Sequence, residues 1–241
     1  MEVMKKIACK STNIHEADPI TIAFLGDSIT QGCFEMVETP DGKFRGVCDQ
    51  EYGYQNKVKK ILMELFPSVP VTTVNAGIGG GGAPHGYERL ERDVLRFNPD
   101  LVVVCFGLND CMAGIDCLDE YIGALKGIFS KLQSAGIESI FMTPNMMATE
   151  AGGFFSAPEL QKTAEEISKV QNNGVLELFL LSACDLCKNM NVPVCDCYDV
   201  WKRMNKCGVN TNRLLANHLN HPTRNMHWLF ALSLVNQMLT D

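Results

Sequence analysis

Residues 22–32 read IAFLGDSITQG, and the interpretation of the whole chain starts from this stretch. An unbroken apolar run leads straight into a glycine, an acid and a serine, which is typical of a buried strand that ends in a loop. The pattern therefore predicts a strand that ends near Gly26 and a loop that presents Ser28. A serine at that place raises the question of what its hydroxyl does.

Four more apolar runs follow: VPVTTVNAG at 69–77, DLVVVCFG at 100–107, ESIFMTP at 138–144 and VPVCDCYDVW at 192–201. Amphipathic segments that we expect to be helical lie at 52–66, 86–97, 118–136, about 158–190, and from about residue 224. Continuously apolar strands that alternate with helices indicate a parallel sheet covered on both faces. We therefore expect one α/β domain over residues 1–241, a three-layer α/β/α sandwich around a five-stranded parallel sheet.

In a doubly wound sheet of this kind, the loops at the carboxyl ends of the strands carry the ligands. The strand ends in this chain read GDSIT, NAGIGGGG, FGLND and TPNMM. Residues 38–50 are expected to form an irregular insertion at the rim, and residues 149–159 a second, mobile loop.

The chain has 241 residues, of which 46% are hydrophobic and 20% charged, and a net charge of −7 with no basic block. This distribution argues against a nucleic-acid partner or an anionic membrane surface. No apolar run is long enough to span a bilayer, and residues 1–19 lack the apolar core of an export signal. We therefore expect a cytoplasmic protein.

Eleven cysteines, an odd number in a chain without an export signal, predict free thiols in a reducing compartment instead of a disulfide framework. The candidate zinc ligands are Cys184, Cys187, Cys195, Cys197 and Cys207. The first pair falls in a helical pattern and the second on an expected strand, unlike the paired knuckles of structural zinc sites. Buried thiols are the preferred interpretation, and no metal is expected.

Gly77, Gly79 and Gly82 formally match the GxGxxG fingerprint of dinucleotide-binding sites. Such a site also needs an acid at the end of the next strand to hold the ribose. The next strand here ends in CFGLND, and Asp100 comes before it instead of after it. The sequence therefore disfavours a nucleotide, and no cofactor is expected.

Ser28 does not lie in GxSxG, so it is not the nucleophile elbow of the α/β-hydrolases. A serine hydroxyl still becomes a nucleophile when a histidine takes its proton. His221 fits best, because it directly precedes Pro222 in a restricted loop just ahead of the last helix. Three others are expected before the first strand, at the head of a helix, and in the last helix as a half-buried packing residue: His15, His85 and His227.

The stretches GDSIT, NAGIGG, FGLND and NHP occur in the order and approximate spacing of the four sequence blocks of the SGNH (GDSL-type) hydrolases. The chain resembles this family over nearly its whole length. The resemblance implies a carboxylic ester hydrolase of flavodoxin-like fold, with Ser28 as the nucleophile and His221 as the general base. It also implies an oxyanion hole formed by the backbone N–H groups of Ser28 and Gly80 and the side-chain amide of Asn109.

The chemistry agrees with this resemblance, because three donors from adjacent strand ends can converge on a developing oxyanion. Glycine suits such a position, since it lets the backbone approach the substrate closely. The alternatives are that Gly80 only makes a tight turn and that Asn109 caps the following helix. Asp27 and Asp110 are expected mainly to cap helices or brace loops.

The chain departs from the family at one position, because His218 stands where the family has an aspartate that orients the base. A histidine cannot supply a fixed negative charge. Three alternatives remain: a backbone carbonyl orients His221 in a Ser–His dyad, an acid such as Asp196 or Asp199 arrives from elsewhere, or the chemistry is impaired. In the last case the protein is a binding module on a hydrolase scaffold.

The family that the chain resembles includes acetylesterases acting on sugars, lysophospholipases, thioesterases and broad carboxylesterases. A long acyl chain needs a contiguous apolar groove, whereas the rim segments 38–50 and 149–159 mix polar residues and glycine with a few phenylalanines. We therefore expect a small-molecule ester substrate with a short acyl group, acetyl on a carbohydrate-type alcohol. A lipid acyl hydrolase is the alternative, and the oligomeric state stays open.

Overall fold

The computed structural model describes residues 1–41, 43–152 and 155–240. Five parallel strands form the central sheet, in the order β4-β1-β5-β6-β7. Their bounds are β1 Ile20–Gly26, β4 Val71–Gly77, β5 Leu101–Cys105, β6 Glu138–Met142 and β7 Val194–Cys195. Numbered along the sheet's own strands, this order is 2-1-3-4-5, the flavodoxin-like order. The expected five-stranded parallel sheet is confirmed.

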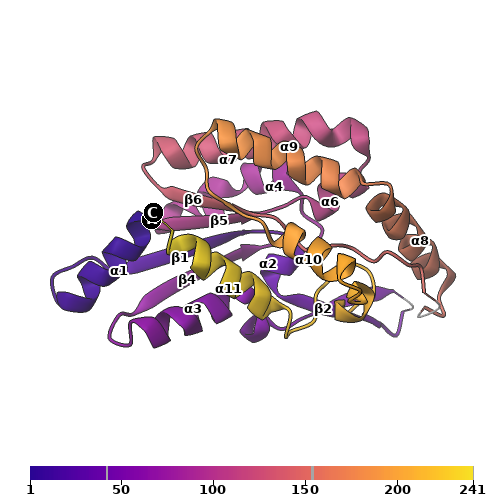
Figure 1. Ribbon diagram of the computed structural model, residues 1–241, viewed down its shortest axis with the longest axis horizontal. Helices are drawn as coiled ribbons and strands as arrows, with labels where there is room; N and C mark the ends of the chain where they lie inside the picture. Colours follow the sequence, from indigo (N-terminus) through magenta and orange to yellow (C-terminus); the bar gives the residue numbers. More distant parts are fainter. Residues whose placement is uncertain (42, 153–154, 241) are drawn as a thin grey trace.

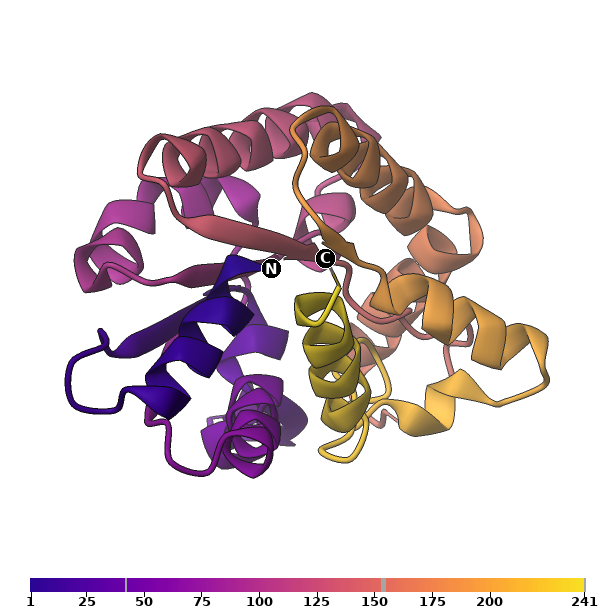
Figure 2. The ribbon, with the colours of Figure 1, turned by 60° about the vertical axis from the view of Figure 1, so that its left-hand side comes forward.

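Helices cover both faces of this sheet, because its strands are apolar on both sides: every residue of β5 is buried. Figures 1 and 2 show α7 and α9 above the sheet, and α1, α3 and α11 below it. The helices are α1 Glu2–Thr12, α2 Ser28–Gln31, α3 Tyr54–Leu65, α4 Ala83–Glu88, α5 Leu90–Asp93, α6 Leu108–Met112, α7 Leu118–Ser134, α8 Pro158–Asn172, α9 Val175–Asn189, α10 Cys197–Lys206 and α11 His227–Met238. Short 3-10 turns lie at Gln50–Tyr52, Leu95–Phe97, Ile115–Cys117 and Thr211–Leu214.

Several element boundaries differ from those expected. The long helix over 158–190 is two helices, because Gly174 takes a left-handed φ of 73° between α8 and α9. The helix expected at 86–97 is broken into α4, α5 and a 3-10 turn. The strand expected over 192–201 is only two residues long, because Asp196 accepts from the Asp199 N–H and caps α10. Cys197 therefore begins a helix.

The segment 38–50 is not an irregular insertion. Residues Cys33–Glu38 (β2) and Phe44–Cys48 (β3) pair as an antiparallel hairpin outside the main sheet. A disulfide between Cys33 and Cys48 joins the two strands, so the expectation of free thiols is wrong for this pair. The other nine cysteines are free, and no cluster of three or more metal-ligating side chains occurs within the described residues.

The N-terminal helix α1 was not anticipated. It buries Val3, Met4 and Ile7, and Glu138 at the start of β6 accepts hydrogen bonds from the N–H groups of Glu2 and Val3. These acceptors satisfy donors that a helix start leaves unpaired. None of the helices in the described part of the chain combines the length and hydrophobicity needed to span a bilayer.

Candidate active site

Ser28 lies at the carboxyl end of β1, where the strand turns directly into α2. Asp27 caps this short helix by accepting the Ile29 N–H at 2.9 Å. Position 26 has no space for a side chain, because a Cβ would lie 2.1 Å from Thr30 Oγ1 and 2.7 Å from the Cys105 carbonyl oxygen. The tight turn leaves the Ser28 N–H in the first turn of a helix, where backbone donors lack helical partners.

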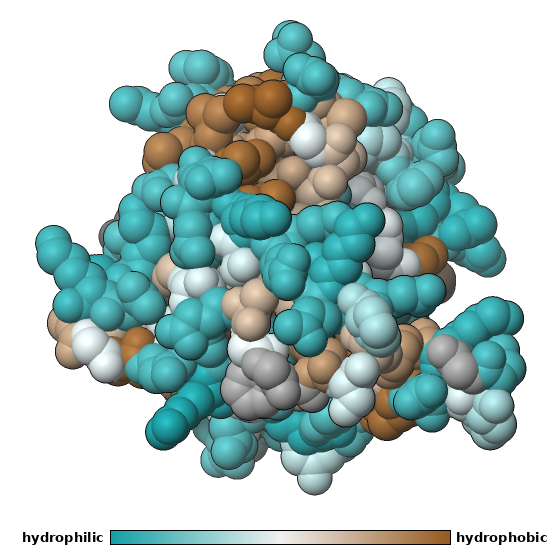
Figure 3. Space-filling model, turned by 90° about the vertical axis from the view of Figure 1, so that its right-hand side faces the viewer, coloured by the Kyte–Doolittle hydropathy of each residue, from teal (hydrophilic) through white to brown (hydrophobic). Residues whose placement is uncertain are grey.

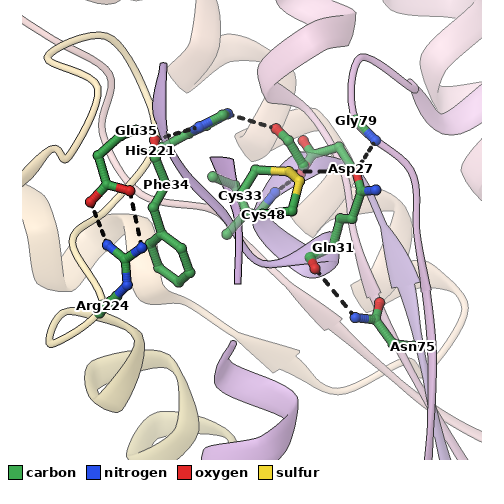
Figure 4. The surroundings of a disulfide bond; sticks show 12 residues. Asp27, Gln31, Cys33, Phe34, Glu35, Cys48, Asn75, Gly79, His221 and Arg224 are labelled. Atoms are coloured by element: carbon green, nitrogen blue, oxygen red, sulfur yellow. Dashed lines mark hydrogen bonds and ion pairs between the residues drawn. A yellow bond between two sulfur atoms is a disulfide. The ribbon is translucent and has the colours of Figure 1, made fainter. Parts of the chain in front are cut away.

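His221 reaches Ser28 from the far end of the chain. Its Nε2 lies 2.9 Å from Ser28 Oγ, and its Nδ1 lies 3.0 Å from the carbonyl oxygen of Phe34 (Figure 4). A carbonyl only accepts, so the Nδ1 atom carries the proton and Nε2 is left to accept from the serine. Burial lowers the pKa of His221, against a smaller raising effect of the Phe34 hydrogen bond, and so keeps the imidazole neutral.

The loop that carries His221 is fixed by its own side chains. Asn217 Oδ1 accepts the N–H groups of Leu219, Asn220 and His221 at 2.9–3.0 Å. Asn145, after β6, donates to the Asn220 carbonyl at 2.9 Å. The loop that carries His221 is therefore held at the carboxyl edge of the sheet, where its imidazole can contact Ser28.

Gly80 and Asn109 lie beside Ser28, and all three line one cavity of about 540 Å³. Gly80 has a left-handed φ of 75°, and a Cβ there would meet no atom within 4 Å. Asn109 Nδ2 donates to the Gly81 carbonyl at 3.0 Å and lies 3.5 Å from Asp27 Oδ2. Asn109 therefore braces the glycine loop and does not cap α6.

The glycine-rich loop is held close to the serine loop by Gln31 and Arg89. Gln31 Oε1 accepts the Gly79 N–H at 2.8 Å (Figure 4). The buried guanidinium of Arg89 donates to the carbonyl oxygens of Gly26 at 2.8 Å and Ala76 at 2.6 Å. These bonds fix the ends of β1 and β4 relative to each other.

Asp27 and Asp110 cap and brace loops, as expected. Asp110 accepts from the Ala83 N–H at 2.7 Å and the Gly107 N–H at 2.9 Å. Burial raises the pKa of Asp110, and it raises the pKa of Asp27 to about 7. Asp27, next to the serine, is therefore largely protonated below neutral pH.

The cavity lining mixes polar and apolar side chains. The polar ones include Ser28, Asn109 and His221. The apolar ones include Met36, Met112, Leu160, Ile167 and Leu219. Gly80 also borders two neighbouring cavities of about 510 and 340 Å³, both lined by His85 and Glu88.

Figure 3 views the end of the molecule at which the strands have their carboxyl ends. Most of this surface is hydrophilic, with a broad hydrophobic area at the top of the view, at the height of α7 and α9 in Figure 1. Leu178 and Leu181 on α9 are exposed.

The remaining candidates do not form part of the serine–histidine pair. The acceptor that faces His221 Nδ1 is a backbone carbonyl, while His218 lies in the same loop with a φ of 56°. Asp196 accepts from Thr143 Oγ1, and Asp199 pairs with Arg203 on α10. Sequence reasoning placed His227 as half-buried, but it is fully buried at the start of α11 and accepts the Tyr54 N–H.

Sequence reasoning also missed Phe34, Gln31 and Arg89. Phe34 acts through a main-chain atom, so its residue type carries no signal. Gln31 lies within the quoted stretch 22–32 and follows the serine by three residues, the spacing that places two residues on one side of a helical turn.

The chain is similar to known proteins in sequence and in fold. The model of the GDSL-like Lipase/Acylhydrolase family matches residues 24–229. An acetylxylan esterase from Geobacillus stearothermophilus is 30% identical over 132 residues, which cover 51% of this chain and 58% of the esterase. A little over half of that relative's length is therefore matched.

Two crystal structures share the fold. A two-domain esterase active on acetylated mannans has a TM-score of 0.69 at 19% identity, over 98% of this chain and 52% of that chain. The acetylxylan esterase of Geobacillus stearothermophilus has a TM-score of 0.67 at 20% identity, over 92% of this chain and 95% of that chain. The family model matches most of this chain, and the four sequence blocks meet at one edge of the sheet. The chain therefore belongs to the GDSL-like lipase/acylhydrolase family.

Proposed function

We propose that the protein is a serine esterase that removes an acetyl group from a carbohydrate-type alcohol. The observation that carries the proposal is the 2.9 Å contact between Ser28 Oγ and His221 Nε2, in a cavity shared with Gly80 and Asn109. A neutral imidazole whose other nitrogen donates to a carbonyl is the base that a serine nucleophile needs.

In the first step, His221 Nε2 takes the Ser28 proton as Oγ bonds to the acetyl carbon. The carbonyl oxygen becomes an oxyanion, which the N–H groups of Ser28 and Gly80 and one N–H of Asn109 Nδ2 stabilise. The Asn109 amide has two N–H groups, and one of them donates to the Gly81 carbonyl, 3.0 Å from Nδ2. The second is held only by the long contact of 3.5 Å between Nδ2 and Asp27 Oδ2, so we assign it to the oxyanion. The bond to the alcohol oxygen then breaks, and His221 gives that oxygen its proton.

The acetyl-enzyme is then hydrolysed, with water in place of the alcohol and His221 again acting first as base and then as acid. His221 takes a proton from water, the resulting hydroxide attacks the acetyl carbon, and Ser28 Oγ leaves with the proton. In the neighbouring cavities, the side chains of His85 and Glu88 offer hydrogen-bonding groups for the hydroxyls of the sugar. Acetylated xylan and mannan are the compounds named for the relatives, and they support this substrate class.

A second candidate has its own observation. The cavity lining includes five apolar side chains, which offer contacts for an acyl chain longer than acetyl: Met36, Met112, Leu160, Ile167 and Leu219. This apolar lining favours a lipid acyl hydrolase or thioesterase. The expected cytoplasmic location stays a prediction under either candidate.

One substrate series tests both candidates. We expect kcat/KM on p-nitrophenyl esters to be highest for acetate and to fall through butyrate, octanoate and decanoate, with turnover of acetylated xylo- or manno-oligosaccharides. Ser28→Ala is the blank, because loss of the nucleophile's function costs on the order of a million-fold in a serine hydrolase. A preference for octanoate or decanoate would support the lipid candidate, and no turnover of any ester would support a binding module.

A further inference from the structure

The carbonyl that orients His221 lies on a strand outside the main sheet. Phe34 is the second residue of β2, which pairs with β3 as a two-stranded hairpin. The pairing runs from Cys33–Cys48 to Met36–Gly46 with a register shift, so Phe34 and Glu35 together face the single residue 47. Such a bulge leaves ladder groups unpaired, and an isolated two-stranded hairpin is only marginally stable. The ladder by itself therefore does not fix the Phe34 carbonyl.

Arg224 crosses from the His221 loop to this bulge. Its Nη1 and Nη2 donate to the two carboxylate oxygens of Glu35, the second at 3.0 Å (Figure 4). Its Nε lies 3.4 Å from Asp49 Oδ2, just beyond β3. Its guanidinium carbon also lies 4.4 Å from the centre of the Phe34 ring.

The same two segments are thus joined twice, by residues that are three positions apart on one side and adjacent on the other. His221 contacts Phe34, and Arg224 contacts Glu35. The planar guanidinium fixes a carboxylate in direction as well as in distance, because both N–H···O bonds lie in one plane. The Cys33–Cys48 disulfide joins the hairpin strands beside this contact.

We propose that Arg224, paired with Glu35, is a positioning residue that holds the Phe34 carbonyl against the Nδ1 proton of His221. The carbonyl takes the place of the aspartate that His218 replaces, and the ion pair keeps the carbonyl in that place. The inference rests on the proposed function, because the orientation of His221 affects a rate only if His221 is the base.

The ion pair contributes little to stability, since the side chains of Arg224 and Glu35 are 30% and 41% exposed. The rate of catalysis is more sensitive to this ion pair than stability is, because a misplacement of about 1 Å in a catalytic group costs roughly 100-fold in rate. A positioning role therefore predicts a large loss of kcat with a small change in melting temperature.

The test compares Arg224→Met, Glu35→Gln and the double variant with the wild type. Arg203→Met is the matched control, because Arg203 also forms a surface ion pair, with Asp199 at 2.8 Å on α10. Turnover of p-nitrophenyl acetate gives kcat and KM, and the labelling rate of Ser28 by a fluorophosphonate reports its nucleophilicity without an ester substrate. The downfield proton resonance of His221 Nδ1–H reports the hydrogen bond itself.

We expect kcat and the labelling rate of Arg224→Met to fall by about 10- to 100-fold, with KM little changed. The double variant should be no worse than the worse single variant, because the two residues act as one unit. Arg203→Met should behave as the wild type, and the downfield resonance should shift or broaden only in the Arg224 and Glu35 variants.

Wild-type labelling and kcat in Arg224→Met would overturn the inference. So would a loss that follows the folded fraction measured by circular dichroism, since that is a structural effect. A wild-type protein that neither labels nor hydrolyses any ester would instead overturn the proposed function, and the proton resonance would still decide whether Arg224 holds the carbonyl.

Discussion

Asp27 directly precedes the serine, and its substitution by asparagine tests the electrostatics of the site. Asp27 is 1% exposed, and burial raises the pKa of its carboxyl from 3.8 to about 7. The displacement of roughly 3 pH units corresponds to about 4 kcal/mol at 1.36 kcal/mol each. Asparagine keeps an oxygen to accept the Ile29 N–H but has no proton to lose.

The sign follows from proton counting. Between about pH 4 and pH 7 the unfolded chain has released the Asp27 proton, whereas the folded chain keeps it. The free energy of unfolding therefore falls by about 1.4 kcal/mol per pH unit in this window and levels off above about pH 7. Asp27→Asn removes this dependence.

His227 acts in the opposite direction. Burial lowers its pKa to about 3, so the unfolded chain binds a proton between about pH 3 and 6.5 that the folded chain does not. The free energy of unfolding then rises with pH by a total of about 5 kcal/mol. In the wild type the two groups largely cancel between pH 4 and 6.5, and Asp27→Asn exposes the rise due to His227.

Urea unfolding followed by circular dichroism from pH 4.5 to 8, at constant ionic strength, measures the effect. We expect the difference in unfolding free energy, Asp27→Asn minus wild type, to increase by about 3 kcal/mol over this range. Asp119→Asn, at an exposed position in the first turn of α7, is the control. If the unfolding free energies of wild type and Asp27→Asn differed by the same amount at every pH, the reasoning would be refuted.

The other predictions concern the site itself. Asn109→Ala should lower kcat by about 100-fold with a smaller change in KM, and a loss of melting temperature alone would mean that its amide only braces the Gly81 carbonyl. His221→Ala should be nearly as damaging as Ser28→Ala, whereas His218→Ala should keep most of kcat, because the acceptor at Nδ1 is the Phe34 carbonyl; equal inactivity of both histidine variants would contradict this. Replacing both Cys33 and Cys48 by serine should lower the unfolding free energy by roughly 3 kcal/mol, the value for a loop of this length, and lower kcat, with the dithiol-reduced wild type as the comparison.

Much of the fold was predictable, because β1, β5 and β6 are largely apolar runs that end in glycine or a polar loop. The boundaries that failed have local causes. Gly174, after two asparagines, was a visible sign of the break between α8 and α9, since glycine readily takes a left-handed φ. The end of β7 depends on the side chain of Asp196, which either continues a loop or caps a helix, and the sequence does not distinguish the two.

Ser28 and His221 became candidates through residue type and place in the chain, and Gly80 and Asn109 through the resemblance of the sequence blocks to the family. The strand order places the ends of β4, β1 and β5 side by side, so Gly80, Ser28 and Asn109 line one cavity, which His221 joins from the last loop. The partner of Nδ1 was not predictable. It is a main-chain oxygen on a hairpin whose place depends on a disulfide and on Arg224, which is 189 residues from Glu35 in the chain.

A carbonyl orienter has a chemical consequence that an aspartate does not. A carboxylate stabilises the imidazolium that forms when the base takes the serine proton, whereas a carbonyl offers only a dipole. The carbonyl in turn cannot be protonated, so its orientation of His221 persists in acid. With the pKa of His221 held below the 6.5 of an ordinary histidine, the base also stays neutral to lower pH. The proposed dyad therefore trades stabilisation of the imidazolium for an active form that extends further into acid than that of a base with an ordinary pKa.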